Sequence, residues 1–162
     1  MDAVTLHPYL GRSALDPFLE RPDKGSIILC RTSNSGAGDF QDLLSDGMPI
    51  YQHVAQQVSS SWNANRNCML VVGATYPEEM KVIRRIVGAE IPFLVPGVGA
   101  QGGDVRAVLQ AGLDHNKQGL ILSSSREILY ASSDDNFAEA ARQKAKKTRD
   151  EINSHRFENI DT

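Results

Sequence analysis

Short runs of apolar residues recur along the chain and alternate with longer segments whose apolar positions are spaced three or four residues apart. Such short runs are typical of strands buried on both faces, and the longer segments of helices with one buried face. The runs predict five strands, near residues 2–7, 26–32, 68–74, 92–97 and 119–123. Strands that alternate with helices indicate a parallel sheet built from βα units, so the predicted fold class is α/β.

The segments between these runs predict helices over residues 13–20, 50–62, 76–87, 104–111 and 137–152. Ser13 is a candidate N-cap of the first helix. Pro77, followed by two glutamates, favours a helix start at that point, since proline fits the first turn and acids complement the helix dipole.

Two polar segments are expected to be loops. Residues 33–49 would form an unusually long connection between a strand and its helix, and residues 59–67 contain the only tryptophan, Trp62. His53 is expected on the solvent-facing side of the helix that lies between these two segments.

The composition is that of an ordinary globular domain, with 41% hydrophobic and 23% charged residues over 162 positions. A net charge of −3 gives no support for binding to nucleic acid or to an anionic membrane. The basic cluster of Lys144, Lys146, Lys147 and Arg149 is therefore interpreted as a solvated helix face, with nucleic-acid contact as the lesser alternative.

No apolar run approaches 18 residues and the N-terminal segment has no signal-peptide pattern, so neither a membrane span nor secretion is expected. Cys30 and Cys68 fall in predicted buried strands and are interpreted as free thiols in a reducing cytoplasm. Neither cysteine has metal-ligand spacing to the other or to a histidine, so no metal site is predicted.

The stretch from Phe93 to Asp104 carries the most chemical information. An apolar strand ends in Pro96-Gly97-Val98-Gly99, and Ala100-Gln101-Gly102-Gly103 follows before a predicted helix. Glycines allow a sharp turn and close approach to a ligand, and a helix start offers free N–H groups to an anion. Taken alone, the pattern is also that of a tight strand-to-helix connection.

The sequence of this loop resembles the P-G-V-G-A-Q-G-G signature of the orotidine 5'-phosphate decarboxylase family, which lies in the loop after the family's seventh strand. Four further segments resemble the family's fourth, fifth, sixth and eighth strands, in that order: residues 2–11, 29–36, 71–75 and 120–126. The chain is identified as a member of this family, in the branch found in many bacteria and some protozoa.

The resemblance implies a TIM-type (β/α)8 barrel, here an incomplete barrel of about five βα units. Residues 1–153 would form the C-terminal part of the decarboxylase domain, and residues 154–162 a tail. The family carries its chemistry in an Asp, a Lys and an Asp-x-Lys-x-x-Asp segment on its first three strands. No Asp-x-Lys-x-x-Asp segment occurs in this sequence, so no catalytic residue is assigned and the chain alone is expected to be inactive.

A phosphate site after strands seven and eight is common in such barrels. The resemblance implies that Arg126 grips the phosphate, and that Gln101 bridges the phosphate and the pyrimidine. The backbone N–H groups of Gly102 and Ser125 would complete the cradle. Ser125 stands where the family commonly has glycine, and a side chain there restricts the backbone. Without the resemblance, Arg126 would be interpreted as an exposed loop arginine.

The pyrimidine would be held by Ser33, with Pro96 and Val98 forming an apolar wall beside the reacting carbon. On its own, Ser33 could equally be a turn or N-cap serine. His7 stands at a strand end, where a general base could act, but a hydrogen-bonded structural histidine is the preferred interpretation.

The implied activity is decarboxylation of orotidine 5'-phosphate to UMP in pyrimidine biosynthesis, in the cytoplasm, by an enzyme without metal or organic cofactor. The intact enzyme would be a homodimer that binds this nucleotide and neither nucleic acid nor membrane. The alternative is a non-catalytic phosphate-binding fragment or truncated gene product. A sister barrel decarboxylase acting on a sugar phosphate is disfavoured by Gln101 and by the Thr32-Ser33-Asn34 loop.

Overall fold

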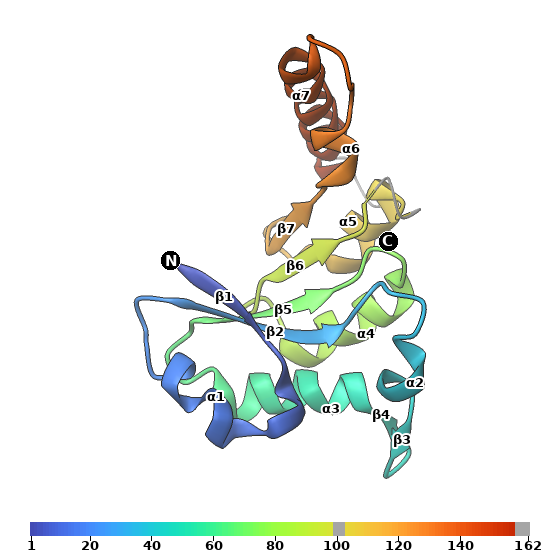
Figure 1. The fold of residues 1–162 in the computed structure, drawn as a ribbon. Coiled ribbons are helices and arrows are strands. Elements are labelled where there is room, and N and C mark those ends of the chain that lie inside the picture. The colour runs from blue at the N-terminus through green and yellow to red at the C-terminus, as the bar shows by residue number, and fades with distance from the viewer. Residues whose placement is uncertain (99–102, 158–162) are drawn as a thin grey trace.

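A computed structural model describes residues 1–98 and 103–157 of the chain. Its centre is a parallel five-stranded sheet in the order β1-β2-β5-β6-β7 (Figure 1). The strands are β1 (Ala3–Leu6), β2 (Gly25–Arg31), β5 (Cys68–Val72), β6 (Phe93–Pro96) and β7 (Leu120–Ser123). They lie where the apolar runs predicted them, so the α/β class is confirmed.

Four helices lie on one side of this sheet, as Figure 1 shows. They are α1 (Arg12–Leu19), α3 (Ile50–Gln57), α4 (Pro77–Val87) and α5 (Val105–Gly112). Beneath them, Ile28, Leu70 and Phe93 are fully buried partners across three adjacent strands. The main hydrophobic core therefore lies between the sheet and its helices.

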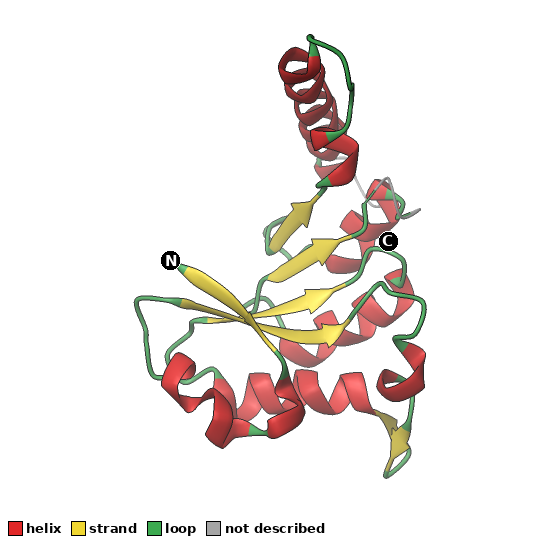
Figure 2. Cartoon of the chain, in the orientation of Figure 1, coloured by secondary structure: helices red, strands yellow, loops and turns green. Residues whose placement is uncertain are grey.

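The opposite face of the sheet carries a second apolar row, because successive residues of a strand point to opposite faces. Leu29, Val71, Leu94 and Ile121 are consecutive partners across β2, β5, β6 and β7. Among the described residues no helix lies over this row in Figure 2, and Ile121 is 46% exposed although Val71 is buried. The sheet ends at β1 and β7 without closing, which confirms the expected partial barrel of five βα units.

Residues 33–49, expected to be a loop, fold into short elements, so that prediction is wrong. They form the helix α2 (Gly38–Gln41) and a hairpin of β3 (Leu44–Ser45) with β4 (Met48–Pro49). The turn residues Asp46 and Gly47 both have positive φ, of 51° and 77°, as a two-residue Asp-Gly hairpin turn requires.

The hairpin also changes the surroundings of His53 on α3. The His53 Nε2 atom lies 2.8 Å from the carbonyl oxygen of Ser45. His53 is thus partly exposed, and on this side α3 also contacts the hairpin.

The helix predicted over 50–62 is confirmed in extent, although its last turn has a different geometry. After Gln57 the chain continues as a π-helix, η2 (Val58–Trp62), and Trp62 is buried with 9% exposure. The expected loop over 59–67 is thus shortened to the residues that follow Trp62.

The helix ends follow local chemistry. The start of α4 at Pro77 is as predicted, and its C-cap Gly88 has a φ of 64°. The prediction of Ser13 as an N-cap is wrong, because α1 begins at Arg12 and Gly11, with a φ of 76°, occupies the cap position. Glycine at this position allows a backbone turn that a larger residue would strain.

Two helices follow β7, α6 (Arg126–Leu129) and α7 (Phe137–Arg156), and α7 packs against α5 and α6 (Figure 1). The last helix extends four residues beyond the predicted end at Ile152, and the Arg156 Nε donates to the carbonyl oxygen of Lys117 at 2.6 Å. No helix in the described ranges is both long enough and apolar enough to traverse a bilayer.

Arg84 ties the amino-terminal end of the sheet to the helices around it. Its guanidinium donates to the carbonyl oxygens of Gly88, Ile91, Gly112 and Gly119, and stacks on the ring of Phe93 at 3.8 Å. Burial lowers the pKa of Arg84 to about 10, so this side chain stays charged at neutral pH. A single cation thereby satisfies carbonyl groups at the junctions that flank β6 and β7.

The prediction of free buried thiols is confirmed. Cys30 and Cys68 are both buried and unbonded to another cysteine. Burial raises the pKa of the Cys30 thiol to about 12 and that of the Cys68 thiol to about 11. Both side chains therefore behave as small apolar residues rather than as nucleophiles.

Candidate functional site

The carboxyl ends of the parallel strands lie along one edge of the sheet, the edge at which α/β barrels bind their ligands. The structure places the described candidate residues at this edge, on or just after three strands: Ser33 after β2, Pro96 and Val98 at β6, and Ser125 and Arg126 after β7. Gln101 and Gly102 lie outside the described residues.

Ser33 lies directly against the end of the neighbouring strand β5. A Cβ atom on Gly73 would stand 2.8 Å from the Ser33 Cβ and 2.9 Å from its nitrogen. The Gly73 N–H also donates to the carbonyl oxygen of Arg31 at 2.7 Å. Only a glycine at position 73 leaves Ser33 this place between β2 and β5.

Val98 and Pro96 continue the edge on β6. Val98 is 4% exposed and forms a parallel bridge with Gly103, and the Pro96 carbonyl accepts the Ala74 N–H at 2.9 Å. A Cβ atom on Gly103 would meet the Ala74 Cβ at 2.4 Å. Gly103 is therefore packed tightly against Ala74, just beyond the end of β5, and Val98 is buried beside it.

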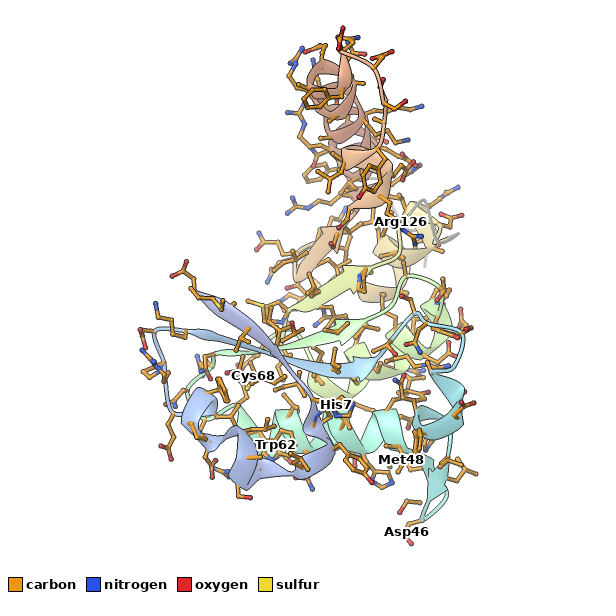
Figure 3. The ribbon with its side chains drawn as sticks, in the orientation of Figure 1. His7, Asp46, Met48, Trp62, Cys68 and Arg126 are labelled. Atoms are coloured by element: carbon orange, nitrogen blue, oxygen red, sulfur yellow. The ribbon has the colours of Figure 1, made fainter. Side chains whose placement is uncertain are left out.

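Arg126 is the first residue of α6, separated from the end of β7 at Ser123 by two further serines, and its side chain is exposed (Figure 3). Ser125 precedes it with a φ of −94°, which any residue adopts without strain. The serine that replaces the family's common glycine is thus accommodated. Ser33 and Arg126 stand on β2 and β7, separated in the sheet by β5 and β6.

Gln41 is a polar residue of this edge that the sequence analysis missed. Its Oε1 accepts the Thr32 N–H at 2.9 Å, and its Nε2 donates to the Thr32 Oγ at 2.8 Å. The Thr32 hydroxyl in turn donates to the Asn34 Oδ1 at 2.6 Å. Thr32, before Ser33, is therefore held directly by the Gln41 amide, and Asn34, after Ser33, is linked to that amide through the Thr32 hydroxyl. The sequence shows a glutamine nine residues after Thr32, which could have indicated this contact. The contact nevertheless requires the helix α2, which the sequence analysis did not predict.

A hollow of about 610 Å³ opens beside these residues, between the ends of β1 and β2 and the helix α2. Its lining is mainly apolar and includes His7, Leu29, Thr32, Phe40 and Gln41. His7 Nδ1 accepts the Tyr9 N–H at 3.2 Å and so caps the short 3-10 helix η1 (Pro8–Leu10). His7 accordingly has the structural hydrogen bond that was expected of it.

Three basic residues of α7, Arg142, Lys144 and Arg149, form ion pairs with acids. Lys144 forms an ion pair with Glu127 of α6, and Arg149 with the adjacent Asp150. A second hollow, of about 480 Å³, lies between α5, α6 and α7 and is lined by residues of both charges, among them Arg106, Lys147 and Glu151. Such mixed charge does not make a basic surface for nucleic acid. Over residues 1–98 and 103–157, no three His, Cys, Asp or Glu side chains are grouped to hold a metal ion.

Comparison with known proteins agrees with this arrangement of strands. Residues 1–143 match the model of the Orotidine 5'-phosphate decarboxylase / HUMPS family. The chain is 55% identical over 154 residues to the orotidine 5'-phosphate decarboxylase of Janthinobacterium sp. (strain Marseille), which covers 95% of this chain and 56% of that protein. It is 57% identical over 152 residues to that of Cellvibrio japonicus (strain Ueda107), covering 94% of this chain and 55% of that protein.

A solved structure, that of OMP decarboxylase from Leishmania donovani, superposes on the chain with a TM-score of 0.84 at 38% identity. The superposition covers 96% of this chain and 57% of the Leishmania chain. The chain thus spans about half the length of the curated relatives that it matches.

Proposed function

The chain belongs to the orotidine 5'-phosphate decarboxylase / HUMPS family, and we propose that the whole protein converts orotidine 5'-phosphate to UMP and CO2. The observation that carries the proposal is the position of Ser33, Val98 and Arg126 at the carboxyl ends of β2, β6 and β7, within the stretch that matches the family. In this reaction the carbon–carbon bond to the carboxylate breaks, its electron pair remains on the ring carbon, and a proton takes the place of CO2.

Within this function, Arg126 holds the phosphate through its planar guanidinium, and Gln101 bridges phosphate and pyrimidine. The backbone N–H groups of Gly102 and Ser125 add donors to the phosphate. An exposed arginine at the end of a strand can reach a phosphate without first breaking a buried ion pair. The exposure of Arg126 supports this assignment.

Ser33 contacts the pyrimidine edge, and Pro96 and Val98 form the apolar wall beside the reacting carbon. Ser33 offers both a hydroxyl and a backbone N–H, and its place against Gly73 limits the directions in which these groups can point. Burial of Val98 supports a wall that excludes water from the reacting carbon.

These residues bind and orient the nucleotide, but none of them transfers the proton. The 162 residues contain no Asp-x-Lys-x-x-Asp segment. The proposal therefore assigns to this chain the phosphate and pyrimidine contacts, and requires the carboxylate and ammonium groups of the reaction to come from elsewhere in the whole protein. A second candidate, a phosphate-binding chain without catalysis, is favoured by this absence together with the open sheet.

We further propose that residues 1–153 belong to one barrel domain with 154–162 as a tail. We propose that the whole protein acts as a homodimer in the cytoplasm, on a free nucleotide, without metal or organic cofactor. The net charge of −3 and the paired charges of α7 speak against nucleic acid or an anionic membrane as a partner.

Substitution of Arg126 in the whole protein tests the phosphate assignment. Arg126→Ala should lower kcat/KM and the affinity for UMP by about 10-fold to 100-fold, since a hydrogen bond to a charged group contributes roughly 1.5–3 kcal/mol. Steady-state kinetics and calorimetric UMP binding measure the two quantities. Arg85→Ala, which removes an exposed arginine from α4, is the matched control and should leave both unchanged. Unchanged kinetics in Arg126→Ala would remove this residue from the site.

A further inference from the structure

Arg31, the last residue of β2, is a buried cation close to the proposed site. Its side chain is 2% exposed, and its guanidinium carbon lies 3.9 Å from the ring centroid of Tyr76. The Nη2 atom pairs with Asp42 at 3.2 Å and with Glu79 at 3.9 Å. A buried charge is costly unless it is paired, and Arg31 has two carboxylates and an aromatic face around it. The guanidinium is therefore fixed in place.

One end of this guanidinium points to the amide that holds Thr32. The Arg31 Nη1 donates to the Gln41 Oε1 at 3.4 Å, and the same oxygen accepts the Thr32 N–H at 2.9 Å. The Gln41 Nε2 donates to the Thr32 Oγ at 2.8 Å. The three contacts agree on one orientation of the amide, since each oxygen partner is a donor and the nitrogen partner is an acceptor.

Ser33 is thus bounded on two sides. Thr32 before it is bonded through both its N–H and its hydroxyl, and the hydroxyl is bonded onward to Asn34 after it. On the other side stands the bare backbone of Gly73, with no room for a Cβ atom. The conformation of the Thr32-Ser33-Asn34 segment therefore depends on the Gln41 amide and on the strand β5.

We infer that Gln41, held by the buried Arg31, is a positioning residue that sets the place of Ser33 at the pyrimidine. The inference rests on the proposed function, because it concerns the contact that Ser33 makes there. Gln41 itself need not touch the nucleotide. Its effect is transmitted through Thr32, one residue away from Ser33.

The expected size of the effect follows from the sensitivity of catalysis to position. A displacement of a contacting group by about 1 Å can lower the rate by as much as 100-fold. Gln41→Leu keeps the approximate volume but removes all three contacts, and should lower kcat/KM by about 10-fold to 100-fold. Gln41→Glu keeps an acceptor for the Thr32 N–H and for Arg31, and should retain most of the activity.

The test is a double-substitution cycle of Ser33→Ala and Gln41→Leu, measured as kcat, KM and UMP affinity in the whole protein. If Gln41 acts through Ser33, Gln41→Leu should have little further effect once the Ser33 hydroxyl is absent. A purely structural role would instead give additive losses. Gln57→Leu replaces an exposed glutamine of α3 and is the matched control, expected to behave as the unmodified protein.

Thr32→Val gives a second route should Gln41→Leu fail to fold. This change removes the hydroxyl bonded to Gln41 and Asn34, keeps the shape of the side chain, and should lower kcat/KM in the same direction by a smaller factor. Its loss should also vanish in the Ser33→Ala background.

The outcomes separate the inference from the function on which it rests. Activity lost in Ser33→Ala but kept in Gln41→Leu, or additive losses in the cycle, would overturn the positioning role and leave the function standing. Full activity in Ser33→Ala alongside a loss in Arg126→Ala would remove the pyrimidine contact and the inference with it. No conversion of orotidine 5'-phosphate by the whole protein would overturn the proposed function itself, together with the inference.

Discussion

The missing side chain at Gly73 sets how closely the ends of β2 and β5 approach. The atoms that a Cβ would meet belong to Ser33, and two of them are backbone atoms, which cannot rotate away as a flexible side chain can. A side chain at position 73 should therefore displace the backbone of Ser33, because none of the atoms that it would meet first belongs to a flexible side chain that could rotate to make room for it. The stability of the sheet and the geometry of the site are coupled at this one residue.

Gly73→Ala is accordingly expected to affect both properties. It should destabilise the protein by about 1–3 kcal/mol, as overpacking does in a tight interior, and should also lower kcat/KM in the whole protein. Urea unfolding and steady-state kinetics measure the two effects. Gly36→Ala is the control, since its nearest neighbour would be an Asp39 oxygen at 3.6 Å, an ordinary contact. Equal behaviour of the two variants would contradict the crowding at Gly73.

The thiols of Cys30 and Cys68 should resist labelling in the folded chain. Their raised pKa values, about 12 and about 11, leave almost no thiolate at pH 8, and both side chains are buried. A thiol-reactive disulfide reagent should label them rapidly only after unfolding in urea. Ser133→Cys, which places a thiol in an exposed loop, is the positive control and should react at once in the folded chain. Rapid labelling of the native thiols would show that the strands open readily.

The same shifts give a sign for the dependence of stability on pH. Below the usual thiol pKa of 9.0, both cysteines are protonated in the folded and unfolded chains. As the pH rises from there toward the folded values, only the unfolded chain loses protons. These two groups should therefore lower the free energy of unfolding over that alkaline range.

Whether the sequence predicts the position of a residue depends on how far apart in the chain its contact partners lie. Arg126 could be placed because it closely follows an apolar strand, and parallel strands end at a common edge. The bonds from Gln41 to Thr32 could not be predicted, because they require α2 to fold back beside the end of β2. The role of Arg31 was hidden for the same reason: its partners Asp42 and Glu79 come from two different helix regions.

At the scale of elements, predictability followed length and burial. The five strands were identified because each is a continuous apolar run, and α4 because its proline, acids and apolar spacing agree. The helix α2 has four residues and β3 and β4 have two each, too few to show a period. The Asp46-Gly47 pair was the only local signal of the hairpin.

Two helices with different N-caps provide a test at the same scale. The Asp104 side chain accepts the Ala107 N–H at 3.1 Å at the start of α5, whereas Asn136 at the start of α7 makes no side-chain cap bond. Asp104→Ala should therefore cost about 0.5–2 kcal/mol of stability, and Asn136→Ala much less. Urea unfolding of the two variants compares them directly. A larger loss in Asn136→Ala would contradict the assigned caps.

At the scale of the whole molecule, the inner face of the sheet is the main unsatisfied surface. The row of Leu29, Val71, Leu94 and Ile121 is apolar, and among the described residues no helix packs against it (Figure 2). Apolar rows on both faces are what a barrel strand requires, because one face packs on helices and the other fills the interior. The sequence predicted this character of the strands. The resemblance also implied an incomplete barrel of about five βα units, and the sheet does end at β1 and β7 without closing.

The last prediction concerns residues 1–162 expressed alone: they should not convert orotidine 5'-phosphate to UMP. Phosphate and pyrimidine contacts bind the ground state and the transition state alike, and raise the rate only when coupled to groups that act on the developing charge. No Asp-x-Lys-x-x-Asp segment is present to supply those groups, and the open sheet admits water to the site. The assay is release of CO2 from carboxyl-labelled substrate, with protein from a host that lacks its own decarboxylase. The matched control is the Arg126→Ala variant of the same chain. Conversion that exceeds the buffer rate and is lost in Arg126→Ala would show that carboxylates and lysines within these residues perform the chemistry.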